Sequence, residues 1–249
     1  MDLLTERAFN WAFEAKTYSS GVQREFDDKT LTEAWKQILS EHLSVGKHTP
    51  VIVDVGTGPG FFPILLAEMG YDCIGTDISP EMLREAWQNA KEKGVSPQFL
   101  LADADALPFA PGSLDYIISR NVTWTLPDAK QTYRKWVNLL APGGKILIFD
   151  ANWNYQFHND ALMQSVQSDY AEYERRYGIP AIQNTERQDE YRRNSPMCMV
   201  KRPQWDLEVL SRLKLTELSC IYDISAQIWP EEKQLRFRST PMFLIVAEK

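Results

Sequence analysis

Short runs of apolar residues alternate with segments of helical periodicity along the chain from Pro50 onward. The run VIVDVG predicts a buried strand that leads into a glycine turn, and FFPILLAEMG predicts the helix that follows. The same pattern returns in the runs CIGTD, QFLLAD, LDYIIS and KILIFD, with helices expected over about 79–94 and 128–140. Such alternation is typical of a parallel sheet that is covered by helices.

The alternation stops after Asp150, and residues 151–203 are polar, aromatic and partly helical in pattern. Beyond them WDLEVLSRLKL predicts a helix, and LTELSCIYDI and MFLIVAEK predict two closing strands with no clear helix between them. The last strand is expected to be antiparallel because a short link cannot make a parallel crossover. The pattern therefore predicts an α/β fold with a Rossmann-like, seven-stranded, mostly parallel sheet, helices on both faces and an antiparallel last strand.

The length of 249 residues is within the range of a single α/β domain, and we expect one. Within it, residues 1–49 are expected to form an N-terminal helical cap, and residues 50–150 a ligand-binding core. Residues 151–203 are expected to form a lid-like insertion, and residues 204–249 the closing helix and strands.

The formal charge of −7 disfavours a nucleic-acid partner, because a phosphate backbone attracts proteins with a strongly positive surface. Local basic clusters, such as Arg192, Arg193, Lys201 and Arg202, are expected to form a solvated face. No apolar stretch is long enough to span a bilayer, and charges interrupt the first sixteen residues, so neither a membrane partner nor export is expected.

The three cysteines are odd in number and widely spaced, which fits neither a disulfide framework nor a zinc site. They indicate reduced thiols in the cytoplasm, and no metal is predicted. Cys73 and Cys220 lie in apolar runs and are expected in the core, whereas Cys198 lies in a polar stretch and could be exposed.

The segment Asp54-Val55-Gly56-Thr57-Gly58-Pro59-Gly60 lies between the first strand and its helix. Glycines there allow a tight turn and a close approach of bare backbone to a ligand. The third glycine comes one residue too early for the dinucleotide pattern G-x-G-x-x-G, which weakens a nicotinamide interpretation. Asp77 ends the second strand, where a carboxylate can accept hydrogen bonds from ribose hydroxyls, and Asp103 follows the third strand as an acceptor for an adenine amine.

These residues, with GTDISPEML, DADALPF, LDYIIS and APGGKILIFD, resemble the class I S-adenosylmethionine-dependent methyltransferases. The resemblance is closest to the small-molecule branch that includes the ubiquinone and menaquinone biosynthesis methyltransferases, and it covers residues 50–150. It implies S-adenosylmethionine as methyl donor, S-adenosylhomocysteine as product and a small molecule as acceptor, at an N, O, S or C atom that the resemblance leaves open. Nucleic-acid methylation is disfavoured because no N-P-P-Y tetrad follows LDYIIS.

The resemblance also assigns donor-binding roles by position. Asp54 would contact the amino group, Asp77 the ribose, and Asp103 with the backbone at Ala104 the adenine amine. The other implied donor contacts are the turn residues Gly56, Thr57, Gly58 and Gly60, the adenine-flanking Ile78 and Met82, Arg120 and Asn121 at the methionine tail, and Tyr18 as a closing residue. Each has a structural alternative: Met82 could belong to the core, Arg120 could form an ordinary salt bridge, and Tyr18 could pack on its own helix.

A general base is optional for methyl transfer, since the donor is already activated and alignment supplies much of the acceleration. His158, which follows the fifth strand, is a candidate base, against the alternative of a surface histidine. Trp11 and Phe13 could line an acceptor pocket or could form only the apolar stripe of a helix. Asp105 is expected to be a solvent or cap residue.

The aromatic residues of 151–203 favour a lid that excludes water and shapes an acceptor pocket. The alternative is a contact between the subunits of a homodimer. Two further functions stay open at this point: a nicotinamide-dependent oxidoreductase, which would share the first strand, turn and ribose carboxylate, and a non-catalytic protein that binds S-adenosylmethionine.

Overall fold

The computed structural model describes residues 3–43, 49–181 and 186–249, and the side chains of 8, 9, 11–43, 49–181 and 189–249 within them. His48, which the sequence places ahead of the first strand, lies outside the described residues. Among the described helices, none combines the length and the apolar character that crossing a membrane requires.

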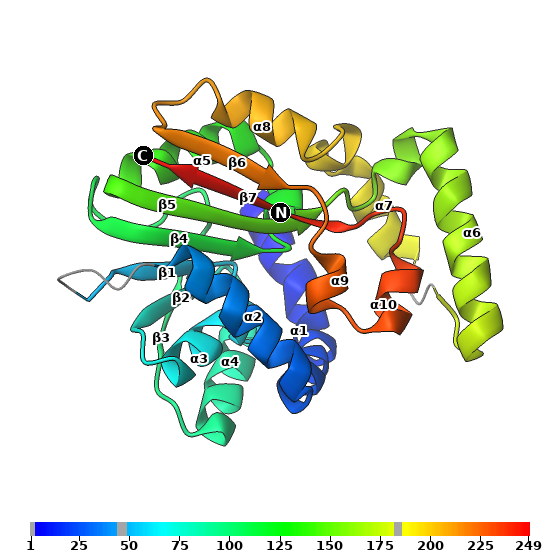
Figure 1. Ribbon diagram of the computed structural model, residues 1–249, viewed down its shortest axis with the longest axis horizontal. Coiled ribbons are helices and arrows are strands. Elements are labelled where there is room, and N and C mark those ends of the chain that lie inside the picture. The colour runs from blue at the N-terminus through cyan, green and yellow to red at the C-terminus, as the bar shows by residue number, and fades with distance from the viewer. Residues whose placement is uncertain (1–2, 44–48, 182–185) are drawn as a thin grey trace.

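A seven-stranded sheet forms the centre of the molecule (Figure 1). Its strands are β1 (Ile52–Val55), β2 (Cys73–Asp77), β3 (Gln98–Leu101), β4 (Leu114–Arg120), β5 (Leu140–Ala151), β6 (Glu217–Ile221) and β7 (Met242–Glu248). They are ordered β3-β2-β1-β4-β5-β7-β6, and β1 to β5 pair in parallel. β7 runs antiparallel to both β5 and β6, which confirms the predicted seven-stranded sheet and its antiparallel last strand.

Side chains of the central strands alternate between two hydrophobic clusters, one on each face of the sheet. In β5, Leu147 and Phe149 belong to one cluster, and Ile146 and Ile148 to the other. All four are fully buried, as expected for strands covered on both faces.

Helices from two parts of the chain cover the first face: α1 (Leu3–Asp27), α2 (Lys29–His42), α3 (Phe61–Glu68) and α4 (Pro80–Lys93). The opposite face is covered by α5 (Ala129–Leu139) and α8 (Gln204–Leu210). Local chemistry defines α4 as predicted: Ser79 accepts a hydrogen bond from the Met82 amide, Pro80 begins the helix, and Gly94 ends it in a left-handed conformation.

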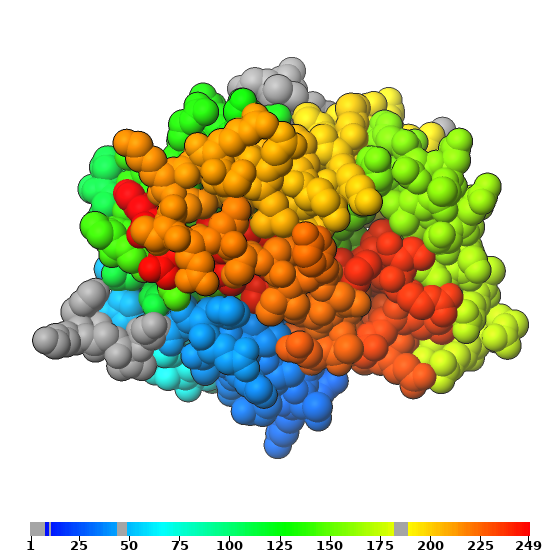
Figure 2. Space-filling view, turned by 45° about the horizontal axis from the view of Figure 1, so that its top comes forward, coloured from blue at the N-terminus to red at the C-terminus, as the bar shows by residue number. Residues whose placement is uncertain are grey.

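The polar segment after β5 forms η2 (Tyr155–His158), α6 (Asp160–Tyr177), α7 (Glu186–Asn194) and η3 (Pro196–Met199). α6 lies at one end of the molecule beside the C-terminal helix α10 (Glu231–Arg236), as the space-filling view also shows (Figure 2). Two short helices, α9 (Ser225–Ile228) and α10, lie between β6 and β7, where the sequence pattern predicted no clear helix. Ile228 and Trp229 pack into the core from this link. Their burial stabilises helices that are too short to show a helical periodicity in the sequence.

The structure decides two questions about the surface. Cys198 belongs to η3 and is fully buried, although its sequence neighbours are polar. Arg202 belongs to the interior rather than to a solvated basic face, because its side chain has no exposed surface and pairs with two buried carboxylates. Cys73 is buried as expected, and Cys220 is only partly buried.

Candidate functional site

The glycine turn lies at the carboxyl end of β1 and forms the floor of the site. Gly56 and Gly58 both have positive φ, at +66° and +53°, which side chains other than glycine rarely adopt. A Cβ on Gly56 would lie 2.4 Å from the Val122 side chain, so this glycine lets the loop after β4 pack against the turn. Gly58 faces open space, with the Met82 sulfur 3.9 Å from where a Cβ would stand.

Asp77 ends β2 and holds the turn in place. One of its carboxylate oxygens accepts the Gly58 amide at 2.8 Å, and the other accepts the Ser79 amide at 2.9 Å. A carboxylate oxygen can accept more than one hydrogen bond, so both can still receive hydroxyl donors from a ligand. The arrangement presents an acidic acceptor at the carboxyl end of the sheet, where open α/β sheets bind their ligands.

Asp54 is 3% exposed and lies beneath the same turn. Burial raises the pKa of its carboxyl to about 7, the nearby Thr57 and Arg120 offset part of that rise, and Asp77 adds to it. A cationic group entering the pocket would favour the ionised carboxylate, because opposite charges stabilise each other in a poorly solvated site. The side chain of Thr57, which is buried beside Asp54, also lines the pocket.

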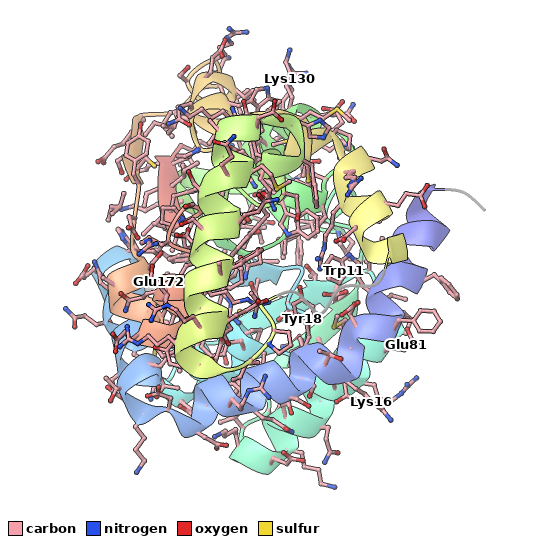
Figure 3. All side chains as sticks on the ribbon, turned by 90° about the vertical axis from the view of Figure 1, so that its right-hand side faces the viewer. Trp11, Lys16, Tyr18, Glu81, Lys130 and Glu172 are labelled. Carbon is pink, nitrogen blue, oxygen red and sulfur yellow. The ribbon has the colours of Figure 1, made fainter. Side chains whose placement is uncertain are left out.

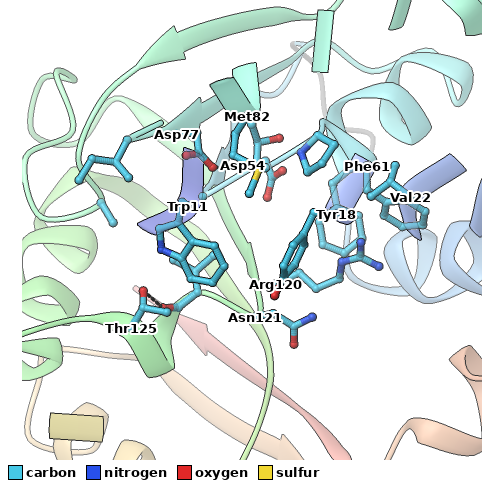
Figure 4. A pocket seen from close by; sticks show the side chains of 18 of the residues that line it. Trp11, Tyr18, Val22, Asp54, Phe61, Asp77, Met82, Arg120, Asn121 and Thr125 are labelled. Atoms are coloured by element: carbon cyan, nitrogen blue, oxygen red, sulfur yellow. Dashed lines mark hydrogen bonds between the residues drawn. The ribbon is translucent and has the colours of Figure 1, made fainter. Parts of the chain in front are cut away.

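These residues line one pocket with an empty volume of about 830 Å³, its open mouth included. Figure 4 shows Asp54, Asp77 and Met82 toward one end and Asn121 and Thr125 toward the other. The remaining wall comes from α1, which contributes Trp11, Tyr18 and Val22. The pocket therefore joins the sheet edge, the loop after β4 and the N-terminal helix.

Trp11 and Tyr18 point from α1 toward the space between α1 and α6, whereas Lys16 points away (Figure 3). Their rings meet edge to face at 5.6 Å, and Trp11 also meets Trp124 at 6.1 Å. Phe13, the other aromatic candidate on this helix, is 71% exposed and does not line the pocket. Of Trp11 and Phe13, the two acceptor-pocket candidates from the sequence, only Trp11 lines the pocket.

Arg120 connects three elements at the side of the pocket. Its guanidinium lies 4.0 Å from the centre of the Phe61 ring and 2.8 Å from the Glu25 carboxylate of α1. Lys233 of α10 lies 3.6 Å from the same carboxylate. Burial acts to raise the pKa of Glu25, but the two cations outweigh it and hold the pKa below its ordinary value. Arg120 thus lines the pocket and forms a salt bridge, so both interpretations of this residue apply.

Asn121 follows Arg120 with φ of +60°, and its side-chain oxygen accepts the Trp153 indole N–H at 3.2 Å. The pocket lining also includes Ile78 and Ala104 from the loops after β2 and β3. Eleven of the thirteen residues assigned to the donor thus come together in one pocket: Tyr18, Asp54, Gly56, Thr57, Gly58, Asp77, Ile78, Met82, Ala104, Arg120 and Asn121. Their individual roles stay predictions.

Three site candidates, Gly60, Asp103 and His158, lie outside the pocket lining. Gly60 begins α3 and packs toward Ala86, and the Asp103 carboxylate accepts the backbone amide of Asp105. Asp105 itself accepts the Thr132 hydroxyl and pairs with a lysine of α5, as expected for a structural residue. The third, His158, is in η2, where its Nε2 lies 3.0 Å from the Arg193 carbonyl oxygen. Its role as a base stays a prediction.

A buried ion network behind the loop after β4 was missed by the sequence reasoning. The Arg202 guanidinium lies 2.9 Å from Asp150, 2.9 Å from Asp206 and 2.6 Å from the Thr123 hydroxyl. Asp150 also accepts the Trp124 amide at 3.1 Å. Two signals could have found it: an acidic residue near the end of a strand, and opposite charges at Arg202 and Asp206, four residues apart at the start of α8.

The described part of the chain contains no group of three or more His, Cys, Asp or Glu side chains able to hold a metal ion. The pocket's two strand-end carboxylates, exposed turn backbone and apolar Met82 wall fit a nucleoside that carries hydroxyls, a flat base and a cationic tail.

Comparison with known proteins agrees with this geometry. Residues 53–148 match the family described as the methyltransferase domain. Over 110 residues the chain is 32% identical to the demethylmenaquinone methyltransferase of Thermus thermophilus, covering 43% of this chain and 50% of that protein. Over 116 residues it is 34% identical to the arsenite methyltransferase of Halobacterium salinarum, covering 45% of this chain and 30% of that protein. The matches thus span half or less of these relatives.

Solved structures share the fold over more of the chain. A phosphoethanolamine N-methyltransferase of Haemonchus contortus in complex with S-adenosyl-L-methionine matches with a TM-score of 0.59 and 18% identity, covering 86% of this chain and 52% of that one. A putative S-adenosyl-L-methionine-dependent methyltransferase of Methanococcus maripaludis matches with a TM-score of 0.55 and 18% identity, covering 93% of each chain. At these identities the likeness shows the fold.

Proposed function

We propose that this chain, which carries a class I methyltransferase domain, transfers a methyl group from S-adenosylmethionine to a small-molecule acceptor. The observation that carries the proposal is that Asp54, Asp77 and the glycine turn line one pocket. All of them belong to the segment that matches methyltransferase domains. The two curated relatives named above methylate small acceptors by name, which supports the acceptor class. The family match disfavours the oxidoreductase alternative.

The donor supplies a positively charged sulfonium whose methyl group is open to nucleophilic attack. The chain's own contribution is to bind, orient and exclude water. Asp77 is positioned to accept ribose hydroxyls, because the Gly58 and Ser79 amides fix the orientation of its carboxylate. Asp54 is positioned to pair with the amino group of the methionine portion, and Met82 and Ile78 to pack on adenine.

On the acceptor side, Trp11 and Tyr18 narrow the pocket with rigid aromatic surfaces. Holding two reactants in line is worth about 7 to 11 kcal/mol of the barrier in well-oriented systems, so a wall of this kind can contribute without exchanging protons. His158 is not required in this scheme, and a His158→Ala variant that keeps near-normal turnover at saturating donor would end its candidacy as a base.

Calorimetry with S-adenosylhomocysteine tests donor binding, and transfer of a labelled methyl group from S-adenosylmethionine into the low-molecular-mass fraction of a cell extract tests activity. We expect binding, and we expect Asp77→Asn to weaken it about tenfold or more, since a hydrogen bond to a charged group is worth roughly 1.5 to 3 kcal/mol. Asp72→Asn is the matched control, because Asp72 is exposed at the other end of β2. No affinity in the folded wild type would refute the proposal; binding without transfer would favour a non-catalytic binding protein.

We also propose that residues 151–203 act as a lid over the acceptor side and that the chain is one functional domain. The support is the position of α6 and α7 opposite Trp11 and Tyr18 (Figure 3). Substitutions in α6 that face this space should change acceptor preference and leave S-adenosylhomocysteine affinity unchanged. Sedimentation of the same variants tests the homodimer alternative: loss of a dimer with unchanged acceptor preference would favour it. Three unpaired cysteines support a cytoplasmic location.

A further inference from the structure

Glu25 connects helix α1 to the side of the donor pocket from just outside the pocket lining. Its Oε2 accepts a hydrogen bond from Arg120 Nη1 at 2.8 Å, although 95 residues separate the two. The Glu25 side chain is 21% exposed and that of Arg120 15%, so little water competes for this contact. A partly buried pair of this kind holds an arginine more firmly than an exposed surface pair does.

Aromatic rings hold the Arg120 guanidinium from other directions. Its central carbon lies 4.0 Å from the ring centre of Phe61 and 5.4 Å from the ring centres of Trp35 and Phe62. The rings limit where the guanidinium can lie, and the Glu25 carboxylate determines how its planar fork is turned. The orientation of Arg120 therefore depends on α1 as well as on the strand that carries it.

Arg120 is also part of the pocket wall, on the same side as Tyr18 and Val22 and away from Asp77 (Figure 4). Among the described residues that line the pocket, Arg120 is the one with a cationic side chain. The methionine portion of the donor carries an ammonium and a carboxylate on one carbon. A pocket in which Asp54 pairs with the ammonium therefore needs a cation for the carboxylate, and the guanidinium fork matches a carboxylate in shape and charge.

Lys233 of α10 brings a second cation to the same carboxylate. Its Nζ lies 3.6 Å from Glu25 Oε1, whereas Arg120 binds Oε2. Two cations thus share one anion, and the three side chains together keep an excess of positive charge. Glu25 can therefore orient Arg120 without cancelling the attraction of this cluster for the carboxylate of a ligand.

We propose that Glu25 is a positioning residue for the methyl donor: it holds the Arg120 guanidinium in the orientation that binds the carboxylate of the donor's methionine portion. The inference rests on the proposed function, because it concerns the donor of the same site. Through Glu25, α1 does more than cover the pocket, since it determines how tightly a charged tail is held. Glu25 lies outside residues 53–148, so the match to methyltransferase domains does not include it.

Calorimetry on the full-length protein compares three ligands: S-adenosylhomocysteine, its carboxamide, whose tail has no negative charge, and 5′-methylthioadenosine, which lacks the amino acid portion. The wild type should bind S-adenosylhomocysteine about tenfold or more tightly than the carboxamide, in line with one charge-assisted hydrogen bond. In Glu25→Ala this preference should fall to about threefold or less, with unchanged affinity for 5′-methylthioadenosine. Glu25→Gln should restore most of the preference, because its amide oxygen can still accept the Arg120 hydrogen bond.

Glu33→Ala is the matched control and should leave all three affinities unchanged, because Glu33 of α2 also pairs with a lysine, at 3.3 Å, but is 71% exposed and lies outside the pocket lining. Equal affinity of the wild type for S-adenosylhomocysteine and its carboxamide, or an unchanged preference in Glu25→Ala, would overturn the positioning role alone.

Equal losses for all three ligands in Glu25→Ala would indicate a merely structural residue and would overturn the positioning role as well. The same holds if Glu25→Gln is no better than Glu25→Ala. Failure of the folded wild type to bind S-adenosylhomocysteine would instead overturn the proposed function, so the two failures are distinguishable.

Discussion

Asp54 combines near-complete burial with a position facing a pocket, so its protonation depends on what the pocket contains. In the protein without ligand, burial raises the pKa of its carboxyl to about 7. A ligand ammonium beside it would lower that pKa, since the ionised form then has a partner. Ligand binding near neutral pH is therefore expected to release a proton from this residue.

The affinity for S-adenosylhomocysteine should increase about tenfold between pH 6 and pH 8. At pH 8 the Asp54 carboxyl, with its pKa of about 7, is already ionised, so ligand binding does not have to displace its proton. Calorimetry at both pH values, in buffers of different ionisation enthalpy, measures the affinity and the released proton together. In Asp54→Asn the dependence should disappear. The same affinity at pH 6 and pH 8 in the wild type would contradict the assignment.

The same residue should have the opposite effect on stability. Its folded-state pKa lies above the ordinary value of 3.8, so its contribution to stability is fully present below that value and is lost progressively as pH rises to about 7. Asp54→Asn should therefore raise the Tm of the ligand-free protein at pH 8 and change it little near pH 4, while weakening ligand binding. Differential scanning calorimetry at the two pH values checks this; a lower Tm of the variant at pH 8 would contradict it.

At the level of elements, the loop after β4 is held from behind by a side chain distant in sequence. Arg202 bonds Thr123 of this loop and Asp150 at the end of β5, and Tyr133 of α5 donates to Asp206 at 2.6 Å. The residues of the network are buried, so each hydrogen bond is protected from water. Through it, α5, α8 and β5 together position the loop that forms one wall of the pocket.

Arg202→Met should destabilise the protein by about 3 to 5 kcal/mol, because it leaves Asp150 and Asp206 buried without their cation. Arg212→Met is the matched control: its pair with Glu208 also spans four residues, but both side chains are more than 60% exposed. That variant should cost no more than about 1 kcal/mol. Denaturant unfolding measures both, and similar losses in the two variants would contradict a special role for the buried network.

In the whole molecule, two distant parts of the chain form the pocket: α1, and the segment 53–148 that matches methyltransferase domains. α1 forms one wall of the pocket. Trp11, Tyr18 and Val22 face the pocket from a helix that precedes β1 by more than twenty residues. α1 is anchored mainly against α4 and through the pair between Glu25 and Arg120. A ligand in the pocket adds contacts to this helix that the ligand-free protein lacks.

S-adenosylhomocysteine should therefore slow hydrogen exchange in the second half of α1 and in the glycine turn more than in α5, which lies on the opposite face of the sheet. A ligand that binds only the folded form stabilises it by mass action, and the opening of elements that contact the ligand is suppressed further. Mass spectrometry of exchanged peptides makes the comparison within one sample. Uniform protection of α1 and α5 would contradict the role of α1 as a pocket wall.

Short-range chemistry made much of the fold and of the donor side predictable. Strand runs, caps and glycines act on their neighbours, and the order of elements leaves few topologies for a parallel sheet. Asp54 and Asp77 could be found because they lie at the carboxyl ends of β1 and β2, with Gly58 in the turn after β1, and parallel strands bring those ends to one edge.

Other features depended on contacts between distant segments. Helices α9 and α10 are too short to show a helical periodicity of apolar residues in the sequence, and packing stabilises them. Cys198 is buried despite its polar neighbours. Arg202 looks like a surface residue until the fold brings Asp150 and Thr123 to it.

The sequence by itself determined the sheet, its strand order in outline and the edge at which a nucleoside can bind, because these follow from periodicity, turn chemistry and strand ends. The tertiary structure alone decided which helix walls the pocket and which charges are buried. The physical reason is the range of the interactions: backbone preferences act over a few residues, whereas burial and pairing of charges exist only after distant segments have packed together.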